Sequence, residues 1–282
     1  MEPFVWSQSA KDPSLFLLSS WMSEHEGLTA GFTGRSGGVS KGRWSSLNTG
    51  LHVGDLDEDV VQNRKRVTAA IGWPHEAWTC AEQVHGSRVY EVLPADRGKG
   101  RASRADAIQD TDALMTNVRG VLLASLYADC VPLYFYDPEH QAMALAHAGW
   151  KGTVLEIAAR TLEAMAARYG TRPEAVRAAI GPSIGGCCYE VDAVVIDRVK
   201  ALLPSFGLSD EEQALLLLPV ESGKAMVDLR EINRQIMIKA GIMPIHIECT
   251  QWCTGCRRDL FFSHRMEGGP TGRMASWIGL AP

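Results

Sequence analysis

The sequence predicts a single domain that mixes helices and strands. Short apolar runs rich in β-forming residues alternate with amphipathic helical segments along the 282 residues. No internal repeat, low-complexity tract or linker divides the chain, which is long enough to bury a substantial core. We therefore expect one domain of the α+β class over residues 1–282.

Composition limits the classes of protein that fit. The formal net charge of −5 argues against a general nucleic-acid-binding surface. No apolar run approaches the roughly 20 residues that a membrane-spanning helix needs, and the N-terminus lacks the basic start of a signal peptide. The seven cysteines are scattered and odd in number, which favours reduced thiols. We expect a cytoplasmic monomer or homodimer with no nucleic-acid or membrane partner.

The N-terminal part predicts a strand, a glycine-rich loop and a helix. Residues 28–32 have strand propensity and lead into the loop 33–43, which contains Arg35 and Arg43. Such a loop offers backbone N–H groups and positive charge to an anion, although a mobile surface loop fits the composition as well. Residues 57–71 have helical periodicity with acidic residues in the first turn, where the helix dipole favours them.

The middle of the chain places reactive side chains where predicted strands end. Apolar runs predict strands at 121–127, 131–136 and 142–146. Cys130 lies between the first two runs and His147 directly follows the third, while His85 lies where a strand beginning at Trp78 enters a loop. A rigid sheet positions such groups, and the loop leaves them reachable.

Helices and strands continue to alternate towards the C-terminus. We expect helices at 153–169, 191–203 and 228–240, and strands at 89–93, 176–180, 244–249 and 274–278. The first of these helices follows the segment GWKG, so a positive helix end is expected beside His147.

His85, Cys130 and His147 form a candidate metal site. Two imidazoles and a thiolate suit a tetrahedral zinc ion that keeps its fourth position open for water or substrate. The same residue types suit a cysteine nucleophile with a histidine base, or a copper electron-transfer site. A multicopper oxidase is disfavoured because the eight histidines are scattered, with no His-x-His pair. Spacing alone does not decide between the zinc site, the nucleophile and the single copper site.

Further polar residues surround these candidates. Asp129, next to Cys130, is a candidate partner that orients a ligand histidine. Lys151 and Arg265, like the two arginines of the glycine-rich loop, lie where a cation can reach a phosphate group.

Four cysteines have no obvious partners in the sequence. Cys253 and Cys256 resemble half of a zinc ribbon, but no second Cys-x-x-Cys accompanies them. Cys187 and Cys188 are adjacent and therefore poorly placed for ordinary bridging. We expect all four to be structural or incidental.

Motifs spread over nearly the whole chain occur together in one known family. They are TGRSGGVS (33–40), SLNTGLHVGD (46–55), NRKR (63–66), EQVHG (82–86), ADCVP (128–132), AHAGWKG (146–152), AIGPSIGGCCYEV (179–191), CTGC (253–256), and FFSHR with TGRM (261–274). With these motifs the chain resembles the YfiH/YlmD family, known as laccase-domain or polyphenol-oxidase proteins and now as purine nucleoside phosphorylases. It departs at Gly34, where a second Thr is common, and at Met266, where a second Arg often follows.

The resemblance carries expectations for fold, cofactor and reaction. It implies an α/β/β/α layered sandwich with mixed sheets, shared with certain cysteine-dependent toxins. It implies that His85, Cys130 and His147 bind zinc, with copper as the alternative ion. It also implies phosphorolysis of adenosine, inosine and S-methyl-5'-thioadenosine by inorganic phosphate, with adenosine deamination as an accompanying activity.

Individual roles follow from this expectation. The catalytic residues would be Cys130, His147, His85 and His264, and those that bind substrate or phosphate would be Arg35, Asn48, Lys151 and Arg265. His264 would protonate the leaving purine or brace its loop, and Asn48 would bind a ribose hydroxyl or stabilise its turn. Two further functions stay open, a copper-dependent laccase-like polyphenol oxidase and a Cys–His hydrolase or amidase.

Overall fold

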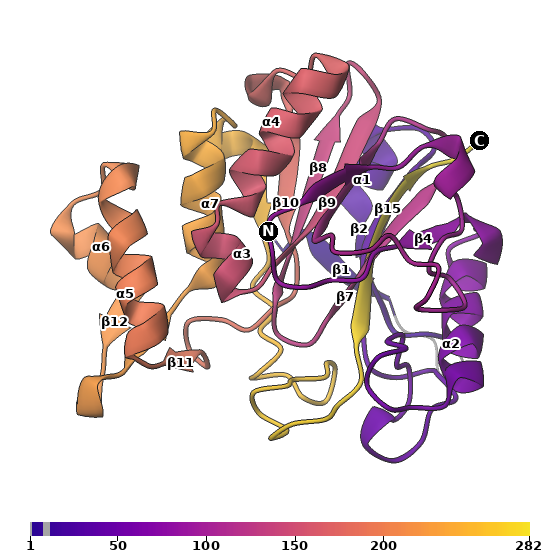
Figure 1. The fold of residues 1–282 in the computed structure, drawn as a ribbon, viewed down its shortest axis with the longest axis horizontal. Helices are drawn as coiled ribbons and strands as arrows, with labels where there is room; N and C mark the ends of the chain where they lie inside the picture. The colour runs from indigo at the N-terminus through magenta and orange to yellow at the C-terminus, as the bar shows by residue number, and fades with distance from the viewer. Residues whose placement is uncertain (1, 8–11) are drawn as a thin grey trace.

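Two six-stranded mixed sheets pack face to face in the computed structural model, which describes residues 2–7 and 12–282 (Figure 1). Sheet 1 has the order β1 (Phe4–Ser7), β2 (Leu15–Leu18), β3 (Leu28–Thr33), β15 (Met274–Leu280), β7 (Leu122–Tyr127) and β4 (Trp78–Cys80). Its neighbours are antiparallel except β4 and β7. The C-terminal strand therefore lies inside the sheet and not at its edge.

Sheet 2 carries most of the central part of the chain. Its order is β14 (Ile247–Cys249), β10 (Arg177–Ile180), β8 (Val131–Asp137), β9 (Ala142–Ala148), β6 (Ala113–Thr116) and β5 (Val89–Glu91). The outer pairs, β14 with β10 and β6 with β5, are parallel, and the inner pairs are antiparallel. Parallel neighbours end at the same edge of the sheet, so the segments that follow them are brought together.

Helices cover the two outer faces. The outer face of sheet 1 packs against α2 (Asp57–Ala70), and that of sheet 2 against α3 (Trp150–Val154), α4 (Ile157–Tyr169) and α7 (Leu229–Lys239) (Figure 1). The helices α5 (Ala193–Leu202) and α6 (Asp210–Leu216) extend the second helical layer together with a small sheet of β11 (Glu190–Val191), β13 (Ala225–Val227) and β12 (Leu217–Pro219). The expected α/β/β/α sandwich is confirmed.

The remaining helical segments are short. They are α1 (Ser19–Glu24) and the 3₁₀ turns Gly42–Trp44, His75–Ala77, Pro94–Asp96, Pro173–Ala175, Leu203–Phe206, Glu221–Gly223 and Pro244–His246. In the part of the chain that the structure describes, no helix has the length and apolar character needed to cross a membrane.

The central strands are apolar throughout because both of their faces are buried. Leu123 and Tyr127 of β7 face the second sheet, while Leu122 and Leu126 face the layer that contains α2. With helices on one side and a sheet on the other, a strand of this kind gives a continuous apolar run in the sequence and no alternation.

The connection between β7 and β8 crosses from one sheet to the other. Since β7 belongs to sheet 1 and β8 to sheet 2, residues 128–130 span the end of the core between the sheets. Asp129 has φ 86° there, a left-handed conformation that turns the chain. Cys130 is thereby placed at the end of that core.

Most of the predicted elements are confirmed, with two local differences. The helix predicted at 153–169 is divided into α3 and α4, because Glu156 adopts a left-handed φ of 54°. The strand predicted at 244–249 begins as a 3₁₀ turn, and only its second half pairs with β10.

Leu123→Ala is expected to lower the free energy of unfolding by about 2–5 kcal/mol, because the fully buried side chain would leave a cavity between the sheets. Leu215→Ala on α6 is the matched control, since Leu215 is 78% exposed and its truncation should change stability by less than about 0.5 kcal/mol. Urea denaturation of both variants measures the difference. Equal midpoints would contradict the placement of Leu123.

Candidate metal centre and pocket

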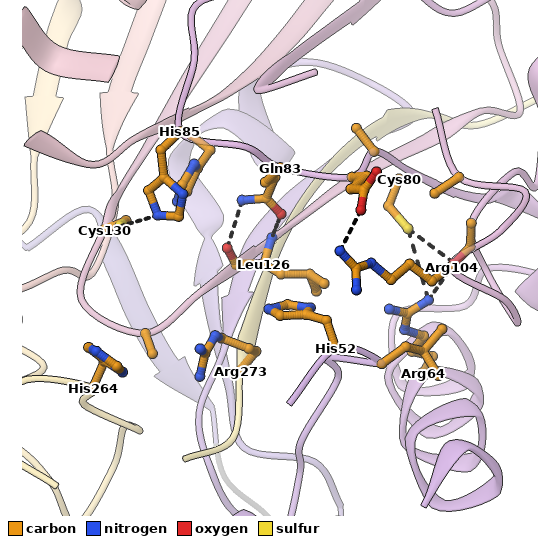
Figure 2. A pocket seen from close by; sticks show the side chains of 17 residues that line it. His52, Arg64, Cys80, Gln83, His85, Arg104, Leu126, Cys130, His264 and Arg273 are labelled. Atoms are coloured by element: carbon orange, nitrogen blue, oxygen red, sulfur yellow. Dashed lines mark hydrogen bonds and ion pairs between the residues drawn. The ribbon is translucent and has the colours of Figure 1, made fainter. Parts of the chain in front are cut away.

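His85, Cys130 and His147 come together from three separate segments of the chain. Their potential ligand atoms all lie within 4.8 Å of one another, and Cys130 Sγ lies 3.9 Å from His85 Nε2 (Figure 2). His147 is buried in β9, His85 is exposed on the loop after β4, and Cys130 lies between these extremes. The cluster is therefore open to solvent on the His85 side.

Asp112 holds two of these three residues in place. Its Oδ1 accepts a hydrogen bond from His147 Nδ1 at 2.9 Å, so His147 presents Nε2 to the cluster. The same carboxylate accepts the backbone N–H groups of Val84, His85 and Gly86 at 3.2, 3.0 and 2.7 Å. Burial alone would raise the pKa of Asp112, but the hydrogen bonds from His147 and the loop hold it below the ordinary value.

The expectation that Asp129 orients a ligand histidine is wrong. Its carboxylate accepts hydrogen bonds from Thr254 Oγ1 at 2.6 Å and from the backbone N–H of Arg265 at 2.7 Å. Asp129 therefore links the loop before Cys130 to the C-terminal segment, and Asp112 is the carboxylate that orients a ligand histidine.

Without a metal, Cys130 and His147 behave as an ion pair. Burial would raise the pKa of Cys130, but the charge of His147 and hydrogen bonds from His147 and His85 lower it to about 6. Burial would likewise lower the pKa of His147, but Cys130 and the hydrogen bond to Asp112 raise it to about 9. Thiolate and imidazolium therefore coexist between about pH 6 and 9 in this protein.

The donor set fits a metal ion with one open position. One soft thiolate and two imidazole nitrogens are ligands of the kind that zinc and copper prefer. The hydrogen bond from His147 Nδ1 to Asp112 is the outer contact that usually fixes the tautomer of a ligating histidine. The exposed side at His85 leaves room for a fourth ligand.

A pocket of about 320 Å³ opens beside this cluster (Figure 2). Its wall combines the three candidate ligands with cationic and polar side chains and a few apolar ones. The residues are Leu51, His52, Arg64, Cys80, Ala81, Glu82, Gln83, His85, Gly100, Arg104, Ala107, Leu126, Ala128, Cys130, His147, His264 and Arg273. Besides the three candidate metal ligands, His264 is the residue singled out from the sequence that lines this pocket.

The four predicted substrate and phosphate contacts do not line this pocket. Arg35 donates to the backbone oxygens of Arg258 and Phe261 and pairs with Glu267 at 2.9 Å, so it braces the C-terminal loop. Asn48 is fully buried, and its Oδ1 accepts the backbone N–H of Arg273 at 2.8 Å.

Lys151 and Arg265, the other two predicted contacts, are exposed on the surface outside the pocket. Lys151 is exposed on α3, with Nζ 5.7 Å from the ring centre of Trp150. Arg265 stacks on Tyr189, with Cζ 5.0 Å from the ring centre, and donates to the backbone oxygen of Glu190. Neither side chain belongs to the pocket wall.

The pocket contains cations that were not singled out from the sequence. Arg273 lies between Gly272 and β15, inside the TGRM motif, and Arg64 lies inside NRKR, so membership of these two motifs is the signal that could have found them. Arg64 is 1% exposed and donates to the backbone oxygens of Thr49 and Gly100 at 2.8 and 2.6 Å, which closes the pocket floor. Arg104 pairs with Glu82, and both side chains line the pocket.

The two cysteine pairs, which the sequence did not connect, meet in the structure. Although adjacency in the sequence makes Cys187 and Cys188 poor candidates for bridging, their sulfurs and those of Cys253 and Cys256 all lie within 4.8 Å of one another. The adjacency of the β10 and β14 loops, which the sequence did not reveal, brings the two pairs together.

Comparison with known proteins agrees with the motifs. The family model described as multi-copper polyphenol oxidoreductase laccase matches residues 29–281. A purine nucleoside phosphorylase named YlmD from Bacillus subtilis is 40% identical over 275 residues, which cover 96% of each chain. Its namesake from Geobacillus stearothermophilus is 44% identical over 253 residues, 90% of each chain. The chain belongs to the YfiH/YlmD family.

Solved structures of the family share the fold. YlmD from Geobacillus stearothermophilus superposes with a TM-score of 0.90 at 40% identity, covering 99% of this chain and 100% of that one. The YfiH protein of Bacillus licheniformis superposes with a TM-score of 0.89 at 41% identity, covering 98% and 99%. The family relationship therefore extends over the whole sandwich.

Asp112→Asn is expected to weaken metal binding by roughly 10–100-fold, because the amide cannot hold His147 and the three loop N–H groups as a carboxylate does. Chelator competition on the purified protein measures the affinity. Asp137→Asn is the matched control, since Asp137 is equally buried and bonds His140 Nδ1 at 2.7 Å away from the cluster. Equal losses in both variants would contradict the assigned role of Asp112.

Cys130 in the metal-free protein is expected to react with iodoacetamide with a midpoint near pH 6. Its folded pKa lies below the ordinary value of 9.0, so the thiolate persists as the pH falls until about pH 6. Cys249 is the internal control, because burial raises its pKa to about 11 and keeps it protonated at neutral pH. Mass spectrometry of the labelled peptides measures both, and a midpoint near pH 9 for Cys130 would contradict the ion pair.

Proposed function

We propose that this protein is a metal-dependent purine nucleoside phosphorylase that acts on adenosine, inosine and S-methyl-5'-thioadenosine. The observation that carries the proposal is the open His85–Cys130–His147 cluster in the wall of a cation-lined pocket. Relatives at 40–44% identity that carry the name purine nucleoside phosphorylase support it. Zinc is the proposed ion, because two imidazoles and one thiolate with a free position make up a catalytic zinc ligand set.

Phosphorolysis requires phosphate to be held against the anomeric carbon while positive charge develops on the ribose. When bound, zinc supplies positive charge and Lewis acidity that orient substrate oxygens or activate water. The reaction therefore depends on how the chain's own residues position nucleoside and phosphate beside the cluster.

Arg273 is the proposed phosphate-binding residue. It is the half-buried cation of the pocket, and its position is fixed because its backbone N–H donates to the buried Asn48. Burial lowers its pKa, which the charges of Cys130 and Asp129 oppose, and a guanidinium stays charged at neutral pH in either case. Its Nη1 donates to the backbone oxygens of Thr271 and Gly272, and the other N–H groups of this planar guanidinium suit a phosphate oxygen pair in the pocket that the candidate metal ligands also line.

The purine would lie beside the phosphate, because its proposed contacts, His264 and His52, line the pocket on either side of Arg273 (Figure 2). His264 is exposed at the wall and is the proposed acid that protonates the leaving base. His52 stays neutral, because partial desolvation and the charge of Arg273 lower its pKa to about 4, and it offers a hydrogen-bond donor and acceptor to the base. Lys151 and Arg265 lie outside this wall and would act on approaching anions only through their charge.

We propose adenosine deamination as a second reaction of the same pocket. Deamination needs activated water at the purine C6, which an ion with an open position supplies if the nucleoside binds in a second pose. A Cys130→Ala variant without bound metal that keeps phosphorolysis and loses only deamination would contradict this shared use of the site.

A Cys–His amidase is the second candidate function, and one observation favours it. Cys130, His147 and Asp112 form a thiolate, imidazolium and carboxylate series of the kind found in cysteine hydrolases. His85 favours the metal site, because such a site needs this third ligand and a hydrolase does not. Activity that is insensitive to chelators and abolished by alkylation of Cys130 would favour the amidase.

A laccase-like oxidase is the function that the family model's description suggests. Multicopper catalysis needs more imidazoles than one mononuclear site provides. Within residues 2–7 and 12–282, the groups that could hold a metal are this cluster and one made of four cysteines. Stoichiometric copper together with oxygen uptake on phenols would be required to support it.

Inosine incubated with the metal-loaded protein is expected to yield hypoxanthine only when phosphate is present. Chromatography of the products, with and without phosphate, measures this. Release of hypoxanthine without phosphate would indicate a hydrolase, and no release in either case would contradict the proposed reaction class.

Arg273→Ala is expected to lower kcat/KM for phosphate by roughly 10²-fold, because the variant lacks one positioned positive charge that stabilises the transition state. Arg172→Ala is the matched control, since Arg172 pairs with Glu139 on the surface, outside the pocket wall, and its loss should leave kcat/KM unchanged. Steady-state kinetics at varied phosphate, with thermal melting to check folding, measures both. An unchanged Arg273→Ala variant would rule out this residue as the phosphate site.

A further inference from the structure

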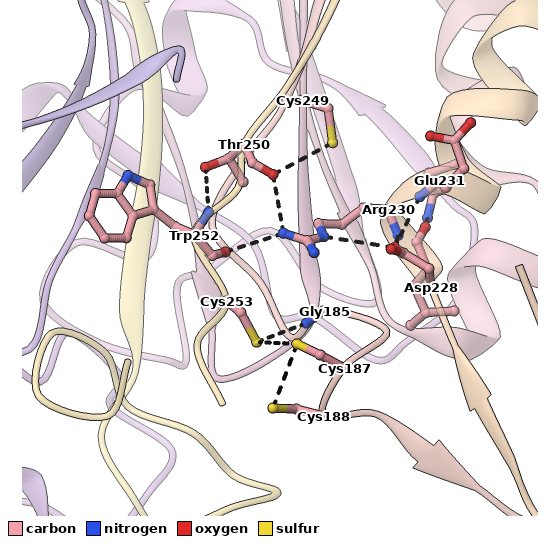
Figure 3. Close-up of polar contacts among 12 residues, drawn as sticks. Gly185, Cys187, Cys188, Asp228, Arg230, Glu231, Cys249, Thr250, Trp252 and Cys253 are labelled. Atoms are coloured by element: carbon pink, nitrogen blue, oxygen red, sulfur yellow. Dashed lines mark hydrogen bonds and ion pairs between the residues drawn. The ribbon is translucent and has the colours of Figure 1, made fainter. Parts of the chain in front are cut away.

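Four cysteines far apart in the sequence meet outside the pocket. Cys187 and Cys188 follow the glycine-rich turn after β10, and Cys253 and Cys256 lie on the turn after β14. Because β10 and β14 are parallel neighbours, their following turns leave the same edge of sheet 2. Figure 3 shows Cys187, Cys188 and Cys253 turned towards one another there.

The sulfur positions match a tetrahedral metal site. Cys187 Sγ lies 3.8, 3.7 and 3.5 Å from the sulfurs of Cys188, Cys253 and Cys256, and Cys188 Sγ lies 3.4 Å from that of Cys256. Four sulfurs at about 2.3 Å from a central zinc ion would be about 3.8 Å apart. A disulfide would require about 2.05 Å. These four distances are close to those of four ligands around one ion, and all sulfur pairs lie within 4.8 Å.

The backbone around the cluster is shaped to bring the two turns together. The N–H of Gly185 donates to Cys253 Sγ at 3.2 Å, a contact that stabilises a thiolate. A Cβ on Gly255 would lie 2.8 Å from Cys188 Cβ and 3.0 Å from its sulfur, so a larger residue could not allow this approach. Thr254 N–H donates to the backbone oxygen of Ser183 and continues the pairing of the two strands.

We propose that Cys187, Cys188, Cys253 and Cys256 bind a zinc ion in a closed structural site. Four thiolates fill the tetrahedron and leave no position for a substrate, which separates this site from the open cluster at Cys130. None of the four cysteines lines the pocket. The ion would join the turns after β10 and β14, between which no disulfide forms.

This site would also support the segment that carries Cys130. Asp129 accepts Thr254 Oγ1 at 2.6 Å through Oδ1, and its backbone oxygen accepts the N–H of Ile184 at 2.9 Å. Each of these bonds begins on one of the two turns that the cysteines join. Joining the turns therefore fixes both contacts to the residue that precedes the candidate ligand Cys130.

The test uses the full chain with the pocket cluster removed by His85→Ala and Cys130→Ala. This variant is expected to retain one equivalent of zinc after purification under reducing conditions, as measured by elemental analysis. X-ray absorption should give four sulfur neighbours at about 2.3 Å. Replacement by cobalt should give the intense visible absorption of a tetrahedral thiolate complex. These measurements need no substitution in the cysteine cluster.

Adding Cys256→Ser to that variant is expected to abolish the retained equivalent, whereas Cys249→Ser should keep it. Cys249 ends β14 on the same edge but lies outside the four-sulfur group, so it is the matched control. Absence of metal from the His85→Ala, Cys130→Ala protein, nitrogen or oxygen neighbours around the ion, or iron in place of zinc would overturn the proposal. A disulfide between any two of the four cysteines that persists under these reducing conditions would also overturn it.

Discussion

The carboxylate of Asp112 is the contact on which the candidate centre depends. It is 3% exposed, and it binds a histidine from one strand and three consecutive backbone amides from a distant loop. A buried carboxylate is stable only when its oxygens are satisfied, so the loop and His147 stabilise the charge that in turn positions them. His85 has a left-handed φ of 61°, which is uncommon for a residue other than glycine, and its backbone N–H is held there by Asp112.

The two-sheet architecture explains where the centre lies. The chain leaves sheet 1 at Tyr127 and enters sheet 2 at Val131, so the intervening residues must cross the end of the core. Tyr127 belongs to the core between the sheets, and its ring centre lies 5.4 Å from that of His147, so it separates the centre from that core. Chemistry can be placed at such a crossing because both sheets hold it rigidly while one side remains open.

The sequence predicted those elements well whose apolar pattern runs over many residues. It did not predict contacts between residues far apart in the chain. The strands of the central core and α2 were recognised because their apolar patterns run through whole elements. The break at Glu156 was not predictable, since a non-glycine residue in a left-handed conformation carries no composition signal. The candidate ligands of the centre were identified by type and position at strand ends.

The outer contacts of the centre were beyond reach of the sequence for physical reasons. Asp112 acts mainly through the backbone amides of a loop 26–28 residues away, and backbone amides have no sequence signature. The two cysteine pairs meet only because β10 and β14 are neighbours, and strand order across a sheet does not follow from local pattern. Arg273 was within a recognised motif, but its place in the pocket depends on the buried Asn48.

The position of β15 between β3 and β7 has a consequence for biosynthesis. Sheet 1 has a gap until Met274–Leu280 has been made, so β3 and β7 cannot be joined before this strand has emerged from the ribosome. Arg273 precedes that strand directly, and its backbone is fixed by the strand's insertion. A nascent chain on the ribosome would thus expose the apolar faces of both neighbouring strands, and the pocket would be completed only after Leu280 is released from the exit tunnel.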